Sequence, residues 1–183
     1  MFQAAAPDGQ VLSRETGHQR DYGRNPYPGY DNVSDRPWMF RGPIDDRLPP
    51  MEKVVGVQIG KEAKAYSHAI TRKRGVIEDR IDGTDVVIFH TADGATSALD
   101  GERIATSRVS GSTGVFRRSS DGQTLSFVVT GGTFTDKQTG STWDVTGQAV
   151  AGPLEGTRLS PVPHVDAFAF AWLAMTPQTK IYR

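Results

Sequence analysis

Residues 127–164, FVVTGGTFTDKQTGSTWDVTGQAVAGPLEGTRLSPVPH, are the stretch that decides the fold. Short runs of β-branched and aromatic residues alternate here with glycines, namely Gly131, Gly132, Gly140, Gly147, Gly152 and Gly156. Glycine adopts the positive φ angles that tight turns between strands require. The stretch therefore predicts several short strands joined by tight turns.

The chain between residues 51 and 127 continues this pattern. Residues 54–59 and 60–66 predict a hairpin around a glycine-centred turn, and Asp82-Gly83 predicts a second hairpin between Val76-Ile77 and residues 86–89. We expect further strands near residues 96–99, 114–117, 124–130, 141–144 and 148–151. Turn signals that recur roughly every eight to twelve residues are typical of all-β domains. The sequence thus predicts a mainly β fold, either an antiparallel sandwich or a barrel-like sheet.

Residues 165–175 predict a short C-terminal helix. Asp166 can cap it, alanine is abundant within it and Thr176-Pro177 ends it. One face is apolar at helical spacing, formed by Phe168, Trp172 and Met175. Such a face belongs more often to a core than to a binding pocket, and both interpretations are kept. In contrast, the basic run at 71–74 predicts a solvated surface turn, because acidic residues follow it closely.

Residues 1–50 differ from the rest of the chain. They are rich in proline and glycine and have no hydrophobic periodicity, but they carry many aromatic rings, among them Tyr22, Tyr27, Tyr30, Trp38 and Phe40. Disordered segments are usually poor in aromatic residues. We therefore expect an ordered, irregular arm over residues 1–50 that lays its rings on a β-rich core domain at residues 51–183.

The composition excludes several classes of function. Basic and acidic residues balance at 21 each, so no overall charge attracts nucleic acid or an anionic membrane. The chain has no cysteine, which excludes disulfides, thiolate zinc sites and cysteine nucleophiles. It has no apolar run long enough to span a membrane. Residues 1–7 lack the basic and hydrophobic regions of a signal peptide.

Three co-linear blocks resemble the domain of unknown function 3179 family of bacteria and archaea. These blocks are residues 21–31 with 41–57, residues 60–66, and residues 136–143 with 152–159. Many members of that family carry cysteines where this chain has residues 90–97, so it is similar to a cysteine-free branch and lacks any thiol or thiolate-metal role. The resemblance implies a location outside the cytoplasm and no assigned activity.

Two further features extend this resemblance. The branch tends to have aromatic and histidine residues where this chain has Ala167 and Ala169, which implies a pocket opened by the smaller side chains. Residues 2–12 also align weakly with residues 172–182, with two identities. This similarity arises either by chance or because the chain corresponds to the second half of a two-repeat parent.

Two histidines are candidates for chemistry. His90 ends a buried-looking strand near Asp93, and His164 precedes Asp166. If both lie together, two imidazoles and two carboxylates form a metal site or an acid–base pair. The alternative, which we favour, is that each histidine caps a strand or turn through one hydrogen bond. His18 and His68 have no partner at diagnostic spacing and are expected at the surface, along with the basic run.

Arg108 and Trp143 are candidates for ligand binding. The Arg108 guanidinium could bind a carboxylate or phosphate in a bidentate manner, or it could hold the arm by pairing with Asp45 or Asp46. Trp143 and Asp136 could orient a ligand. More simply, Asp136 accepts hydrogen bonds within a hairpin turn.

Three functions follow from these residues. The first is a β-rich domain that binds a small ligand or a divalent metal near the C-terminal helix, with Arg108, Trp143, Phe168 and Trp172 at the ligand and His90 and His164 at the metal. The second is a structural module that self-associates or docks on a preceding repeat. The third is an enzyme of unknown reaction that uses His164 with Asp166 or Asp93. The sequence specifies no cofactor beyond that metal.

Overall fold

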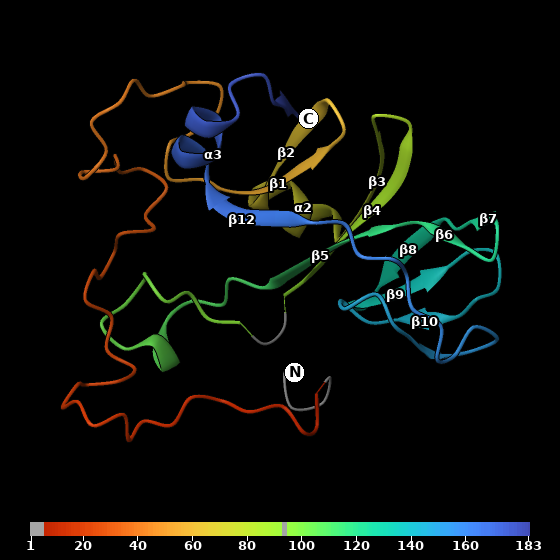
Figure 1. Ribbon diagram of the computed structural model, residues 1–183, viewed down its shortest axis with the longest axis horizontal. Coiled ribbons are helices and arrows are strands. Elements are labelled where there is room, and N and C mark those ends of the chain that lie inside the picture. The colour runs from red at the N-terminus through yellow and green to blue at the C-terminus, as the bar shows by residue number, and fades with distance from the viewer. Residues whose placement is uncertain (1–5, 93–94) are drawn as a thin grey trace.

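The computed structural model describes residues 6–92 and 95–183. This part of the chain is mainly strand and forms several sheets, which confirms the predicted fold class, and these sheets do not close into a barrel. Figure 1 shows the sheets at the centre and right and the N-terminal arm along the left.

The first sheet has the order β12-β1-β2-β13. Its strands are β1 (Lys53–Ile59), β2 (Glu62–Ser67), β12 (His164–Phe168) and β13 (Lys180–Ile181). The β1–β2 pair is the first predicted hairpin. β13 joins the other edge of β2 in parallel, while the remaining pairs in this sheet are antiparallel.

Two further sheets contain most of the other strands. One has the order β3-β4-β5 and consists of β3 (Val76–Ile81), β4 (Thr84–Thr91) and β5 (Ser112–Arg117). The other has the order β11-β10-β9-β8 and consists of β8 (Phe127–Thr130), β9 (Thr133–Asp136), β10 (Thr142–Trp143) and β11 (Ala149–Ala151). A two-stranded ribbon of β6 (Ser119–Ser120) and β7 (Gln123–Thr124) lies between them in sequence.

Helix α2 (His68–Arg74) was missed by the sequence analysis. The Ser67 side chain accepts a hydrogen bond from the Ile70 N–H and caps it, and Gly75 ends it with φ of 67°. Residues 71–74 therefore belong to a helix and not to the predicted turn, while Arg72, Lys73 and Arg74 are exposed as expected. Thr71 is 1% exposed, because this side of the helix packs against β4.

The predicted C-terminal helix begins later than expected. Residues 164–168 form strand β12, and helix α3 spans Ala169–Met175, with Phe168 rather than Asp166 at the N-cap. β12 pairs with β1 so that His164 lies opposite Val57 and Asp166 opposite Val55. Pairing with β12 satisfies backbone groups on the edge of β1 that would stay unpaired if residues 164–168 were helical.

Three clusters of buried side chains form the core. The largest packs Phe89, Phe116, Phe127, Phe134 and Trp143 between the second and third sheets. A second contains Val55 and Tyr66 from the first sheet with Ile88 and Val115 from the second. A third buries Ala169 and Leu173 of α3 against β1 and β2.

The arm has almost no regular structure. Between residues 6 and 50 there is a single bridge, Arg24 to Arg103. The arm runs beside residues 96–110, where a short 3₁₀ turn (Ile104–Thr106) and one bridge, Thr96 to Val109, replace the strand expected at 96–99. The boundary at residue 50 between an arm and a core domain stays a prediction.

Candidate functional site

The candidate site is centred on a contact between His68 and Asp166. His68 opens α2, and its Nε2 lies 2.7 Å from Asp166 Oδ1 on β12. Thr113 on β5 donates from Oγ1 to Asp166 Oδ2 at 2.8 Å. Because a carboxylate accepts and does not donate, the Nε2 of His68 carries a hydrogen. Asp166 thus joins a helix and two sheets through its two oxygens.

The protonation of Asp166 follows from these contacts. Partial burial alone would raise the pKa of this carboxyl, but the hydrogen bonds from His68 and Thr113, with smaller electrostatic contributions from His68 and His164, outweigh that effect. The pKa of Asp166 therefore lies below its usual value, and the side chain is an anion at neutral pH.

A second histidine lies behind His68. His90 on β4 is 4% exposed, and its ring meets that of His68 edge to face at a centroid distance of 5.5 Å. Burial lowers the pKa of His90 to about 4, and smaller electrostatic contributions from His68 and Arg72 act in the same direction. His90 is therefore neutral at physiological pH.

The hydrogen bonds of Thr71 fix the tautomer of His90. The Thr71 hydroxyl donates to the His68 carbonyl oxygen at 3.3 Å, so its oxygen accepts from His90 Nδ1 at 2.9 Å. The Nε2 of His90 then has a lone pair and no hydrogen. This atom is buried and has no partner within the described residues, and the same holds for His68 Nδ1.

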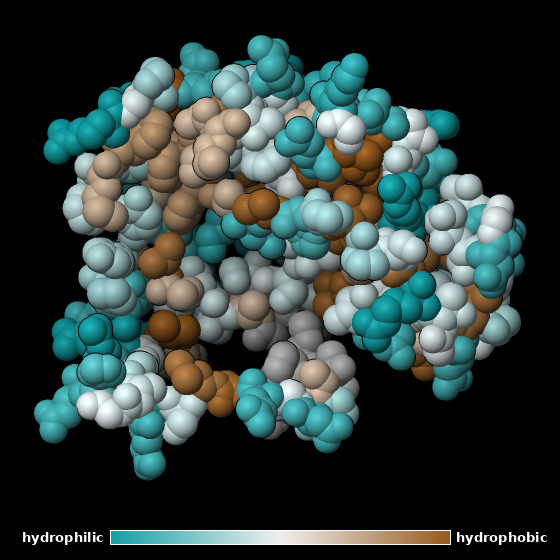
Figure 2. All heavy atoms as spheres, in the orientation of Figure 1, coloured by the Kyte–Doolittle hydropathy of each residue, from teal (hydrophilic) through white to brown (hydrophobic). Residues whose placement is uncertain are grey.

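A cavity of about 320 Å³ opens beside these side chains. Its polar lining residues include Lys53, His68, Thr113 and Asp166, and its apolar lining residues are Leu99, Ala167 and Phe168. A smaller cavity of about 90 Å³ adjoins it, shares Lys53 and His68, and is lined further by Glu52 and Arg72. In Figure 2 the face between the arm and the sheets is visibly hollowed.

His164 and Asp93 are the other residues that the sequence analysis proposed for catalysis. His164 Nδ1 contacts the Val162 carbonyl oxygen at 2.9 Å, and neither His90 nor His164 has the other among its described contacts. The histidine that hydrogen-bonds to Asp166 is His68, while His164 contributes electrostatically to the lowered pKa of Asp166. The use of His164 with Asp166 stays a prediction. Asp93 lies outside the described residues.

Arg108 holds the arm, although not through the expected partners. Its Nη2 lies 2.6 Å from Asp31 Oδ2 and also donates to the Asp31 carbonyl oxygen at 3.0 Å. Asp45 instead pairs with Arg47 at 2.7 Å. Asp31 is buried, and burial alone would raise its pKa, but the hydrogen bonds from Ser97 and Arg108 keep the pKa below its usual value.

Trp143 and Trp172, the two tryptophans predicted to bind a ligand, pack in or against the core. Trp143 is 2% exposed and donates from Nε1 to Asp136 Oδ2 at 3.0 Å, while Asp136 also accepts from the Thr139 and Ser141 backbone. Trp172 donates to Thr179 Oγ1 at 3.1 Å and lies against Gly56, where a Cβ would approach its ring to 2.5 Å. Of the predicted ligand-binding residues, Phe168 lines the cavity described above.

No group of three or more His, Asp or Glu side chains in residues 6–92 and 95–183 has the arrangement of a metal site. Neither helix in these ranges has the length and hydropathy of a membrane span. The proposed metal pair of His90 and His164 therefore gains no support from the geometry.

His68 is the functional candidate that the sequence analysis missed, and its expected surface position is wrong, since it is 8% exposed. Its partner Asp166 is 98 residues away along the chain, so no local spacing could signal the pair. The available signal was Ser67, an N-cap residue directly before His68, which would have placed His68 in the first turn of a helix.

The fold and the site define a mainly β protein in which a carboxylate–imidazole pair borders a cavity under an irregular aromatic arm. The chain belongs to the family described as protein of unknown function (DUF3179), whose model matches residues 1–179. This match confirms the resemblance found in the sequence. Neither a curated protein nor a solved structure matched the chain. Self-association and a preceding repeat stay predictions.

Proposed function

We propose that the cavity beside Asp166 binds a small organic anion with an apolar body. The observation that carries this proposal is that the cavity is lined both by polar residues, among them Lys53, His68 and Thr113, and by the apolar residues Leu99, Ala167 and Phe168. Small-molecule sites are typically concave and apolar, with a few convergent polar groups that orient the ligand.

The balance of charge favours an anion. Both oxygens of Asp166 accept hydrogen bonds from protein groups, so they are already engaged and do not offer free acceptors to a ligand cation. Lys53 and Arg72, in contrast, have no ion-pair partner among the described residues. A ligand carboxylate in the cavity can pair with Lys53 without displacing an internal salt bridge.

The size of the cavity restricts the ligand. About 320 Å³ is near the lower end of the usual range for small-molecule sites. An aromatic or branched monocarboxylate places its apolar body against Phe168 and Leu99 and its charge at Lys53. Ala167 is the smallest of the apolar side chains that line the cavity, so a larger side chain at this position would reduce the space available.

Benzoate is a suitable probe, with benzyl alcohol as its uncharged match. We expect isothermal titration calorimetry to detect benzoate binding to the full chain and little binding of benzyl alcohol. Ala167→Phe fills the cavity and abolishes benzoate binding. Val150→Phe adds similar bulk to an exposed position on β11 and leaves binding unchanged.

Two results would overturn this proposal. One is equal binding of benzoate and benzyl alcohol, which would remove the role of Lys53. The other is benzoate binding that survives Ala167→Phe in a variant with an unchanged melting temperature.

A second candidate function is acid–base catalysis, favoured by one observation. Asp166 orients His68 through Nε2, and the opposite ring nitrogen, Nδ1, has no described partner and could accept a proton. This candidate gives His68 the role that the sequence analysis gave to His164. Hydrolysis of p-nitrophenyl esters tests it: His68→Gln should abolish the activity and His164→Gln should keep it. Equal activity in both variants would remove this candidate.

A further inference from the structure

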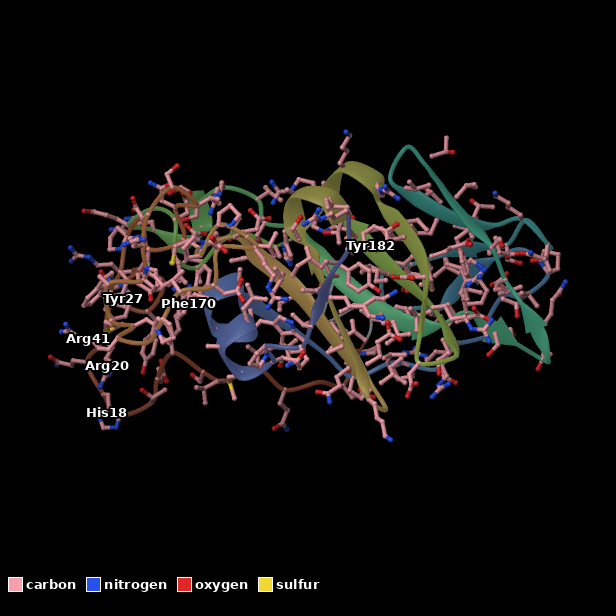
Figure 3. All side chains as sticks on the ribbon, turned by 90° about the horizontal axis from the view of Figure 1, so that it is seen from above. His18, Arg20, Tyr27, Arg41, Phe170 and Tyr182 are labelled. Carbon is pink, nitrogen blue, oxygen red and sulfur yellow. The ribbon has the colours of Figure 1, made fainter. Side chains whose placement is uncertain are left out.

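The arm contains a further cavity, whose lining residues are not shared with the two cavities near His68. It has a volume of about 400 Å³ and is lined by Tyr27, Tyr30 and Trp38 together with Asp35 and Arg36. Figure 3 labels Tyr27 and shows it with Phe170 at the arm end of the molecule, far from Tyr182. Trp38 is 62% exposed and Tyr27 is 47% exposed. Large apolar side chains that are exposed together often mark a binding site.

The three rings stand at angles to one another. Their centroids are 6.4 Å apart for Tyr27 and Tyr30, 6.3 Å for Tyr27 and Trp38, and 6.1 Å for Tyr30 and Trp38. The interplanar angles are 55°, 50° and 85° in the same order. Coplanar rings would form a flat platform, as a sugar ring prefers, whereas inclined rings form the walls of a box.

The spacing suits a compact cation. Because the three centroids lie 6.1–6.4 Å apart, a point on one side of the cluster can lie within the ~6 Å reach of a cation–π contact from all three rings at once. Quaternary ammonium groups match such a site because their methyl groups are weakly hydrated and carry the positive charge to all sides.

The ring faces are not used by a cation of the chain itself. Within the described residues the guanidinium over a ring is that of Arg74, 5.3 Å from the Tyr182 centroid, and not that of Arg36. Asp35 and Arg36 have no ion-pair partner in these ranges. The cavity therefore offers aromatic faces, one carboxylate and one guanidinium, a set complementary to a zwitterion.

The backbone around the rings is held in place before any ligand binds. Asn25 is 2% exposed, and its Oδ1 accepts from the Tyr27 N–H at 2.8 Å. Gly29 N donates to the Asp100 carbonyl oxygen at 2.6 Å, and the Tyr30 ring packs edge-on against Phe168 at 5.7 Å. A site that is already ordered loses less conformational entropy on binding.

We propose that this aromatic cavity binds a quaternary ammonium zwitterion. The trimethylammonium group lies among Tyr27, Tyr30 and Trp38 with Asp35 nearby, and the anionic end of the ligand pairs with Arg36. The shared chemistry is a trimethylammonium beside a carboxylate or phosphate, which is found in free betaines, in phosphocholine and in phosphatidylcholine head groups.

Isothermal titration calorimetry with glycine betaine tests the proposal directly. The matched control ligand is 3,3-dimethylbutyrate, which has the same shape and carboxylate but an uncharged tert-butyl group. We expect glycine betaine to bind and the isostere to bind roughly tenfold more weakly or not at all, because only the cation interacts with the ring quadrupoles.

Variants on the arm localise the effect. Trp38→Ala should weaken binding roughly threefold to thirtyfold, the range for one cation–π face. Tyr27→Phe keeps a ring face and should keep binding. Met39→Ala, at an exposed neighbour outside the cavity lining, is the control for Trp38→Ala. Arg36→Gln should weaken glycine betaine but not choline, which has no anionic end.

Two further binding experiments resolve the source of the ligand. One uses free phosphocholine, and the other uses phosphatidylcholine vesicles with phosphatidylglycerol vesicles as control. Binding to glycine betaine or phosphocholine in solution supports a free metabolite, and binding to phosphatidylcholine vesicles alone supports a lipid head group. Equal binding of betaine and its isostere, unchanged binding in Trp38→Ala, or no binding to any quaternary ammonium probe would overturn the proposal.

Discussion

Gly111 occupies a position where a side chain has no room. Its φ is 78°, a conformation that other residues rarely adopt, and a Cβ there would lie 2.6 Å from His90 Nε2 and also meet the Thr91 carbonyl oxygen. Gly111 also lines the cavity beside Asp166. This one residue therefore allows the chain to pass closely over the buried imidazole.

Gly111→Ala is expected to lower the free energy of unfolding by about 2–4 kcal/mol, because strain at positive φ adds to a clash with His90. Gly122→Ala is the matched control: its φ of 77° is nearly the same, but no atom lies within 4 Å of the added Cβ. It should cost only about 1 kcal/mol. Urea denaturation measures both, and equal losses would show that His90 is not crowded by Gly111.

His90 makes stability depend on pH over a defined window. Its folded-state pKa of about 4 is below the unfolded value near 6.5, so the unfolded chain binds the proton more readily. Stability is therefore highest above pH 6.5 and falls as the pH drops toward 4, by at most about 3 kcal/mol. The charged groups that face His90 are His68 and Arg72 on α2 and Asp166 on β12.

His90→Asn tests this dependence, since its side-chain amide can still donate to Thr71 but does not titrate. We expect the loss of stability between pH 6.5 and 4.5 to become smaller in this variant, as measured by urea denaturation across that range. His18→Asn, at an exposed position, should leave the slope unchanged. If the stability of His90→Asn depends on pH as steeply as that of the unsubstituted protein, the assignment to His90 is contradicted.

The strand conformation of β12 determines where the Asp166 side chain lies. In the strand, Asp166 lies where it reaches both Thr113 on β5 and His68 on α2, so one side chain connects three elements. The residues before and after it continue the pairing with β1. The position of Asp166 therefore depends on the register between β12 and β1.

Thr113→Val should remove one of the two hydrogen bonds of Asp166 and leave the shape of the side chain unchanged. The pKa of Asp166 is then expected to rise toward its usual value, observable as a shift in the carboxyl ¹³C NMR titration. Stability at neutral pH should fall by about 0.5–1 kcal/mol, a modest value because Asp166 is partly open to solvent. Thr133→Val, on an exposed strand position, is the control. An unchanged titration would contradict the bridging role.

The elements could be predicted where their signals are local. The β1–β2 and β3–β4 hairpins follow from alternation and glycine turns, and both formed as expected. The β12 strand could not be predicted, because alanines around Asp166 favour helix and its partner β1 lies far away in sequence. The same separation in sequence explains why the site could not be predicted, because His68 and Asp166 are brought together by the strand pairing of the first sheet.

At the scale of the whole molecule, the arm is fastened by a few polar contacts. Asp31 is buried and receives hydrogen bonds from Ser97 and Arg108, both in the segment between β4 and β5. The aromatic composition predicted an ordered arm, but it did not predict that residues 96–110 would be its main partner. That segment has no strong pattern of its own.

Asp31→Asn should release the arm and leave the sheets intact. The amide replaces an oxygen that faces two donors, at an expected cost of about 1–3 kcal/mol to the arm contact. Hydrogen exchange measured by mass spectrometry should rise in residues 21–38 and stay unchanged in β1. Asp45→Asn, in a more exposed pair with Arg47, should have little effect. Uniform exchange across the chain would show that the arm and sheets open together.

The pairing of β1 with both β2 and β12 also bears on how the chain is made by the ribosome. β2 follows at once and can pair during synthesis, but the other edge of β1 waits until residues 164–168 have emerged. At usual elongation rates that delay is about 5–20 s. During this interval β1, with Val54, Val55 and Val57, offers an open strand edge to other nascent chains. We expect chaperone dependence to concentrate there.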